Sequence, residues 1–356
     1  MTLCAAIALG AGLFWLKRTA FGPRPAPQRQ PEVVWQELLG AVAEQNWQAA
    51  HGAEEELARL GPQAVPLLAR ELQRAHERDT SALEVRQRAA WVLGQIGGEE
   101  AVAALDRKLG SDDETVVRGQ ALLALANLPG ARPPAQLKSV VLNAAEDAGL
   151  RSSAVLLLAR RAELEGTQFL VETLRDRRCP DLERAIIQAL AFSPHAAIAR
   201  APLLDALAHG QSAPLRGDAA LSLARLLKAE AVDPLAQSLQ TEAEYEVRLK
   251  AVEGLGELAA VKTAPPLLLQ VLQQDGEGVV RAAAAARLGI PGAVGLLKPL
   301  EDALATEQDI YVRLKTVEAI AGIGGPQAVA ALQRIADSEY PLRVRGQAQA
   351  ELLKLR

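Results

Sequence analysis

Apolar residues recur along this chain at spacings of three and four, which is the period of an amphipathic helix. In the stretch "VRQRAAWVL", Val85, Ala89 and Leu93 fall on one helical face, and an arginine stands directly after the first of them. Alanine and leucine dominate the composition, while β-branched runs bounded by turn residues are scarce. The pattern therefore predicts an all-α protein without a sheet.

The arginine of that stretch returns every 32 or 33 residues up to the end of the chain. Valine or leucine precedes it in all copies but one, alanine follows three positions later in seven copies, and an apolar residue, most often leucine, follows after seven. Glycine stop signals then end the helix and a second, shorter apolar helix begins, so each unit is predicted to be helix, tight turn, helix. The repeated arginines are Arg86, Arg118, Arg151, Arg184, Arg216, Arg248, Arg281, Arg313 and Arg345.

Units of this size cannot bury an apolar face alone, so they are expected to stack into a solenoid of about ten two-helix units. Residues 84–356 hold the regular repeats. Residues 32–83 are interpreted as an N-terminal cap with a degenerate repeat, in which Ala53 stands at the arginine position. A terminal unit has no preceding neighbour to contact, and this explains why its sequence departs from the others.

The repeated arginines need a physical explanation, because a cation in the first turn of a helix faces the positive end of the helix dipole at a cost of about 0.3–1 kcal/mol. Upstream acids can cap the helix, and the acids or terminal carbonyls of a neighbouring unit can accept the guanidinium. We therefore predict that the arginines are staples between stacked units rather than a ladder of anion-binding cations. The upstream acids are Asp113, Asp147, Asp181, Glu244, Glu277 and Asp309.

The repeat as a whole follows the pattern VRxxAAxxLGxIGxxxAVxxL, seen in "VRQRAAWVLGQIGGEEAVAAL" and in "VRLKTVEAIAGIGGPQAVAAL". It resembles the HEAT repeat, in the short HEAT-like form of the phycobilisome-lyase (PBS-lyase) type, over about residues 51–356. The resemblance implies a right-handed α-α superhelix of the armadillo type, with a concave surface usually made by the second helices.

Candidate catalytic and metal-binding residues are absent from the sequence pattern. The four histidines have no partner at metal-ligand spacing, and the two cysteines are too few for a disulfide framework or a zinc site. HEAT-like proteins of the deoxyhypusine hydroxylase kind hold two irons with several His-Glu dipeptides, whereas here His76-Glu77 stands alone. The glycine pairs at 97–98 and 324–325 are interpreted as turns. We therefore expect no enzyme activity, no cofactor and no bound metal.

The formal charge of -4, from 39 basic and 43 acidic residues, gives no basic footprint for a phosphate backbone, so nucleic acid is not expected as a partner.

Residues 2–16, within the segment 1–21, are apolar and are followed by Lys17 and Arg18. This predicts an N-terminal membrane anchor or signal segment. Residues 22–31 then form a proline-rich linker. The body is placed outside the cytoplasm, periplasmic in a bacterium, with a cytoplasmic body as the alternative.

Three aromatic residues are candidates for contact with a partner: Trp91, Tyr245 and Tyr311. The alternatives are that Trp91 packs against the N-terminal cap and that the two tyrosines pack at edges between units. The sequence predicts a membrane-tethered, non-catalytic scaffold that binds a partner protein through its concave surface. The alternative function is a PBS-lyase-like or other enzyme-associated accessory module that handles a chromophore or cofactor.

Overall fold

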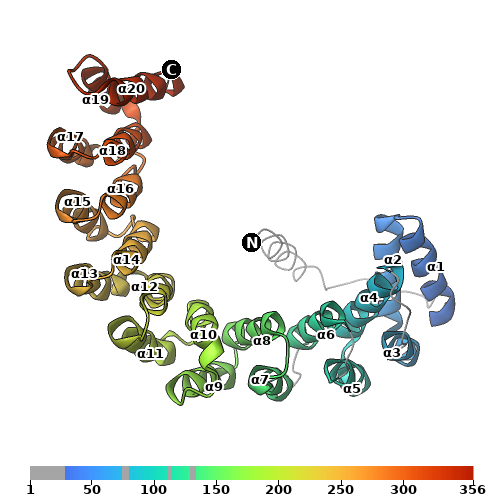
Figure 1. The fold of residues 1–356 in the computed structure, drawn as a ribbon. Helices are drawn as coiled ribbons and strands as arrows, with labels where there is room; N and C mark the ends of the chain where they lie inside the picture. The colour runs from blue at the N-terminus through green and yellow to red at the C-terminus, as the bar shows by residue number, and fades with distance from the viewer. Residues whose placement is uncertain (1–28, 74–79, 111–113, 129–133, 356) are drawn as a thin grey trace. The chain divides into compact units, whose positions relative to one another are not determined.

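A computed structural model describes residues 29–73, 80–110, 114–128 and 134–355 of the chain (Figure 1). All regular structure in these residues is helical: the α-helices α1 to α20 are joined by loops and short 3-10 turns, and no strand occurs in the described ranges. This confirms the predicted all-α class and, with the stacking of helix pairs described below, the α-α superhelix. The described residues form two compact units, one ending at Lys108 and the other beginning at Leu109.

The first unit holds the region that the sequence analysis interprets as a cap. Its first helix packs on the second, and both the second and the third pack on the fourth. Val34, Trp35 and Leu38 of the first helix are almost fully buried, so this helix covers the apolar face that a preceding repeat would otherwise cover. The helices are α1 (Pro31–Ala43), α2 (Trp47–Leu60), α3 (Val65–Gln73), α4 (Thr80–Ile96) and α5 (Gly98–Leu109).

The second unit repeats the pair of helices. Each arginine-bearing helix alternates with a helix without the repeated arginine, and each pair is held by alanine, leucine and valine side chains that are almost fully buried. The helices are α6 (Thr115–Asn127), α7 (Pro134–Leu142), α8 (Ala148–Arg160), α9 (Leu164–Arg175), α10 (Glu183–Leu190), α11 (Ala196–His209), α12 (Ala213–Leu227), α13 (Val232–Thr241), α14 (Tyr245–Glu257), α15 (Ala264–Gln274), α16 (Gly278–Arg287), α17 (Leu297–Thr306), α18 (Ile310–Ile323), α19 (Gly325–Ala336) and α20 (Leu342–Lys354).

Successive arginine-bearing helices of the second unit approach one another through small residues. A Cβ atom added to Gly254 of α14 would lie 3.0 Å from the Cβ of Ala224 in α12. One added to Gly322 of α18 would lie 3.0 Å from the carbonyl oxygen of Gly289, which follows α16. The helices without the repeated arginine lie farther apart, and grooves open between α11 and α13 and between α13 and α15. Figure 1 shows the row of arginine-bearing helices on the inner side of the bend in the second unit. The inner row is therefore made by the first helices of the units, not by the second helices as the resemblance implied.

Helix ends in the structure follow the predicted chemistry at several positions. The side chain of Asp147 accepts a hydrogen bond of 2.9 Å from the backbone of Leu150, which caps α8, and Asp309 caps α18 in the same way. The glycine pair after α4 has φ values of 69° and 83°, and the pair after α18 has 71° and 80°. Backbone in this left-handed region favours glycine, so the glycine pairs are helix-ending turns, as the sequence indicated.

The predicted membrane-anchored localisation needs correction. Across the described ranges of the chain, no helix combines the length and the apolar character needed to cross a membrane. Residues 1–21, on which that prediction rested, and residues 22–28 of the linker 22–31 lie outside the described residues. We therefore withdraw the assignment of the protein to a membrane and of its body to either side of one.

Candidate interaction surface

The repeated arginines of the second unit project from the first turns of their helices into the loops at one edge of the unit. Arg216 donates two hydrogen bonds, of 2.7 and 3.0 Å, to the carboxylate of Glu242, and a third, of 3.0 Å, to the carbonyl oxygen of Gly210. Gly210 belongs to the loop before α12, and Glu242 directly follows α13. One guanidinium therefore joins two successive loops.

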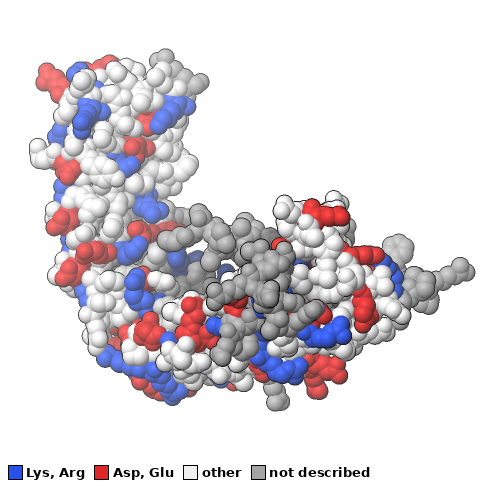
Figure 2. Space-filling view, turned by 45° about the vertical axis from the view of Figure 1, so that its right-hand side comes forward, with Lys and Arg blue, Asp and Glu red and all other residues white. Residues whose placement is uncertain are grey.

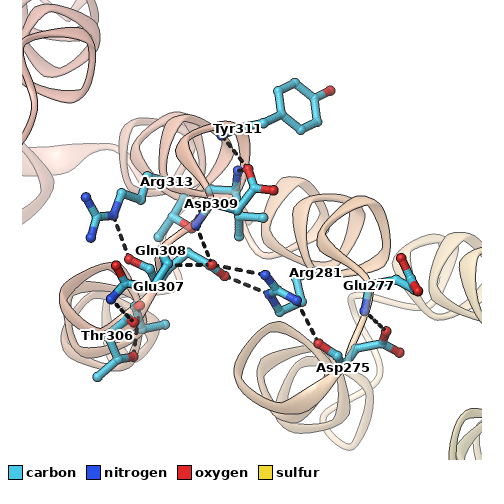
Figure 3. A network of polar contacts seen from close by, with 12 residues as sticks. Asp275, Glu277, Arg281, Thr306, Glu307, Gln308, Asp309, Tyr311 and Arg313 are labelled. Carbon is cyan, nitrogen blue, oxygen red and sulfur yellow. Dashed lines mark hydrogen bonds and ion pairs between the residues drawn. The ribbon is translucent and has the colours of Figure 1, made fainter.

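The next two arginines repeat this arrangement. Arg248 binds the Asp275 carboxylate at 2.7 and 3.1 Å and the carbonyl oxygen of Glu242 at 3.1 Å. Arg281 binds the Glu307 carboxylate at 2.7 and 3.0 Å and the carbonyl oxygen of Asp275 at 2.9 Å (Figure 3). Each loop thus contributes a carboxylate to one arginine and a carbonyl to the next. We call these contacts the arginine ladder: Arg216–Glu242, Arg248–Asp275 and Arg281–Glu307.

Burial and charge both act on the ladder carboxylates. Hydrogen bonds from Arg216 hold the pKa of Glu242 below its usual value. Burial is the largest single influence on Asp275 and Glu307 and opposes their ionisation, but the hydrogen bonds from Arg248 and Arg281, the backbone hydrogen bonds and the charge of the arginines together outweigh it, so the pKa of each carboxyl is lowered. The three pairs are therefore charged at neutral pH, with bidentate geometry that arginine provides and lysine does not.

At its C-terminal end the ladder changes partner. The Nε of Arg313 donates to the carbonyl oxygen of Glu307 at 2.7 Å, and the guanidinium carbon lies 5.8 Å from the ring centroid of Tyr340. An aromatic face thus takes the place of the next carboxylate. The Nε of Arg345 is buried and has no hydrogen-bond partner within the described residues.

Upstream of the ladder the arginine contacts vary. Arg151 donates to the carbonyl oxygen of Val141 at 3.1 and 3.0 Å and pairs with Asp181. Arg118 binds Glu146 at 2.7 Å, Arg184 binds Asp218 at 2.7 Å, and Arg86, in the first unit, is buried. These contacts are consistent with the predicted staples, and their contribution to stability stays a prediction, which the Discussion develops.

The ladder acceptors are residues that the sequence analysis did not single out. It named Glu244, Glu277 and Asp309, whereas the acceptors stand two positions earlier, at Glu242, Asp275 and Glu307. The sequence does hold a regular spacing that marks the acceptors, because each of them lies six residues before the next repeated arginine. This spacing identifies them as acceptors only once the stacking of the loops is known.

The outer surface of these loops is both apolar and acidic. We call residues 241–246, 274–279 and 306–311 the loop edge. Tyr245 is 40% exposed, Val279 45% and Tyr311 54%, and each stands two or three positions before the repeated arginine. The Tyr311 ring points away from the polar network beneath it (Figure 3). Leu342, at the same place before Arg345, continues this exposed apolar row.

A groove opens onto the first loop of the loop edge. It has a volume of about 680 Å³ and lies between α11 and α13, where Leu204, Leu207 and Pro234 supply apolar lining. Arg216 and Glu242 lie at its margin. The groove is of a size that receives a side chain of a partner.

The third predicted contact residue, Trp91, lies in the first unit. It is half-buried, and its ring centroid lies 6.2 Å from that of His51 in α2. Trp91 therefore packs on a helix of the predicted cap, in agreement with the alternative stated for it. More of Trp47 is exposed, and the guanidinium carbon of Arg88 lies 5.5 Å from its ring centroid.

Among the described residues, no group of three or more His, Cys, Asp or Glu side chains is placed to hold a metal ion. Figure 2 shows basic and acidic side chains interspersed over the visible face of the molecule.

Comparison with known proteins decides the family. The profile of HEAT repeats matches residues 36–126, 200–289 and 265–354, which together make up more than half of the chain. The chain belongs to the HEAT-repeat family. The match is to HEAT repeats in general and does not support the PBS-lyase type in particular. No curated protein sequence matches this HEAT-repeat protein.

Solved structures support the same fold. The karyopherin Kap121p bound to the SUMO protease Ulp1p matches with a TM-score of 0.53 at 14% identity, over 94% of this chain and 42% of that one. A mutant of Kap121p gives a TM-score of 0.52 at 14% identity with the same two coverages. The HEAT-repeat chain thus spans less than half the length of these relatives, and at this identity the likeness shows the fold alone.

Proposed function

We propose that this HEAT-repeat protein is a non-catalytic scaffold that binds a partner protein through the loop edge of its second unit. The observation that carries the proposal is the exposed apolar row, in which Tyr245, Val279 and Tyr311 stand two or three positions before the repeated arginine in successive repeats. Exposed aromatic residues in a contiguous surface are typical of sites that bind proteins.

The arginine ladder supports the proposal because it lies directly beneath the exposed row. Bidentate ion pairs and backbone hydrogen bonds hold the three loops, so the side chains above them are presented from ordered backbone. Less entropy is lost on binding when a surface is already ordered.

Support also comes from proteins of the same fold. Kap121p is seen bound to the SUMO protease Ulp1p and, in another structure, to the extreme C-terminus of the protein phosphatase Cdc14p. A protein of this fold can thus bind protein partners, and the extended surface of a solenoid suits contacts that are spread over several repeats. No observation in the described residues favours the alternative of an accessory module for a chromophore or cofactor, and we do not propose it.

Site-specific photocrosslinking tests the proposed function. Benzoylphenylalanine in place of Tyr311, in cells that make the protein naturally, is expected to crosslink to a specific protein, because Tyr311 is 54% exposed on the loop edge. The control position is Lys298 of α17, whose side chain is 79% exposed and pairs with Asp302 of its own helix. Crosslinking of the same protein with equal yield from both positions would contradict the proposal.

A further inference from the structure

The loop edge carries negative charge that the arginine ladder leaves uncompensated. Glu242, Asp275 and Glu307 are each paired with a ladder arginine. On the same loops, exposed carboxylates outnumber exposed cations. Within the described part of the chain, no salt bridge involves the four exposed carboxylates, which are those of Glu244, Glu246, Glu277 and Asp309.

Helix capping does not account for this charge. Only Asp309 caps its helix, by accepting hydrogen bonds from the backbone of Tyr311 and Val312. Glu244 and Glu277 occupy the equivalent N-cap positions of α14 and α16, and their side chains make no capping hydrogen bond. Glutamate is also not among the residues preferred at an N-cap. The two carboxylates are exposed and do not cap their helices, although Arg216 and Arg248 attract them through space.

Apolar side chains alternate with these carboxylates along the loop edge. Tyr245 lies between Glu244 and Glu246, Val279 stands two positions after Glu277, and Tyr311 stands two after Asp309. A cation near an aromatic face beside carboxylates is attracted both by the quadrupole of the ring and by the negative charge of the carboxylates. Such a surface repels phosphate backbones and anionic lipid headgroups.

We propose that the loop edge from Glu244 to Tyr311 binds an extended, basic segment of the partner protein, with lysine or arginine at about every third residue. The inference rests on the proposed function and names the chemistry of the partner. Adjacent packed helices are about 8–10 Å apart and an extended chain advances about 3.3 Å per residue, so about three residues of the segment span one repeat. The groove beside Glu242 receives one further side chain of the segment.

A synthetic probe tests this inference on the full chain. The probe is a fluorescent peptide of about nine residues, with lysine at every third position and valine, serine and threonine between, and the reference peptide has glutamate in place of lysine. Fluorescence anisotropy at about 50 mM and about 150 mM salt is expected to show binding of the lysine peptide alone, weaker at the higher salt.

Removal of the carboxylates then locates the binding. The triple variant Glu244→Gln, Glu277→Gln and Asp309→Asn keeps the cap acceptor of α18 and is expected to weaken binding about tenfold, from several exposed ion pairs. The matched control, Glu172→Gln, Asp233→Asn and Asp302→Asn, removes the same charge elsewhere on the second unit and should change binding less than about twofold. Circular dichroism checks that both variants remain folded.

A second variant keeps the test independent of charge. Replacement of Tyr245 and Tyr311 by alanine should weaken binding of the lysine peptide, and replacement by phenylalanine should restore it. Equal binding of the two peptides, or equal loss in the two triple variants, would overturn the inference. If the lysine peptide fails to bind while position 311 still crosslinks to a protein, the inference fails and the proposed function stands. If both fail, both are wrong.

Discussion

Replacement of Arg248 by alanine lowers the free energy of unfolding by about 2–3 kcal/mol, because a mostly buried carboxylate loses its positively charged partner and two loop carbonyls, those of Glu242 and Ala243, lose their donor. The side chains of Arg248 and Asp275 are only 13% and 7% exposed. Urea denaturation of the full chain, followed by circular dichroism, measures the change.

The control for this prediction is Arg225 of α12, which also pairs with a carboxylate, Glu257. Those two side chains are 39% and 37% exposed, so Arg225→Ala should cost less than about 1 kcal/mol. The effect of Arg248→Ala should also depend on pH. The pKa of Asp275 is lowered in the folded protein, so its contribution is complete above the unfolded pKa of about 3.9 and is lost as the pH falls through the folded value. Equal costs for the two arginines would refute the staple role.

Replacement of Gly254 by valine destabilises the second unit by about 2–3 kcal/mol, because the side chain has no space between the arginine-bearing helices. A Cβ at this position already lies 3.0 Å from the Cβ of Ala224 and 3.4 Å from the Cδ1 of Leu235.

The control is Gly346 of α20, where an added Cβ meets nothing within 4 Å. Gly346→Ala should stabilise by about 0.5–1 kcal/mol, since glycine is a poor helix former. Thermal unfolding that ranks the two variants in the opposite order would contradict the close approach of the helices.

The architecture could be predicted from the sequence because it depends on local patterns. The spacing of Val85, Ala89 and Leu93 indicated the buried face of an arginine-bearing helix, and these three residues are buried in the structure. The glycine pairs indicated the turns, since their meaning is set by backbone sterics within a few residues.

The acceptors of the arginines depended on distant parts of the chain and were not predicted. Glu242 and Arg216 are 26 residues apart, and which acid of a loop faces the arginine follows from the stacking of two units. The sequence also did not predict which row of helices lies on the inner side of the bend. That choice depends on contacts between helices of different repeats, at small residues such as Gly254. The membrane-anchored localisation was corrected on other grounds: no helix in the described parts of the chain has the length and apolar character of a membrane span. The apolar segment 1–21, from which it was predicted, lies outside the described residues.

The most direct test of the central claim, that the loop edge of the second unit is the surface that binds a partner, is hydrogen–deuterium exchange of the full chain alone and in complex with the protein crosslinked at position 311. The account predicts new protection at residues 241–246, 274–279 and 306–311, and unchanged exchange in the turns at 258–263 and 288–296 at the other ends of the helices. Protection confined to those turns or to the first unit, with the loop edge exchanging as in the free protein, would contradict it.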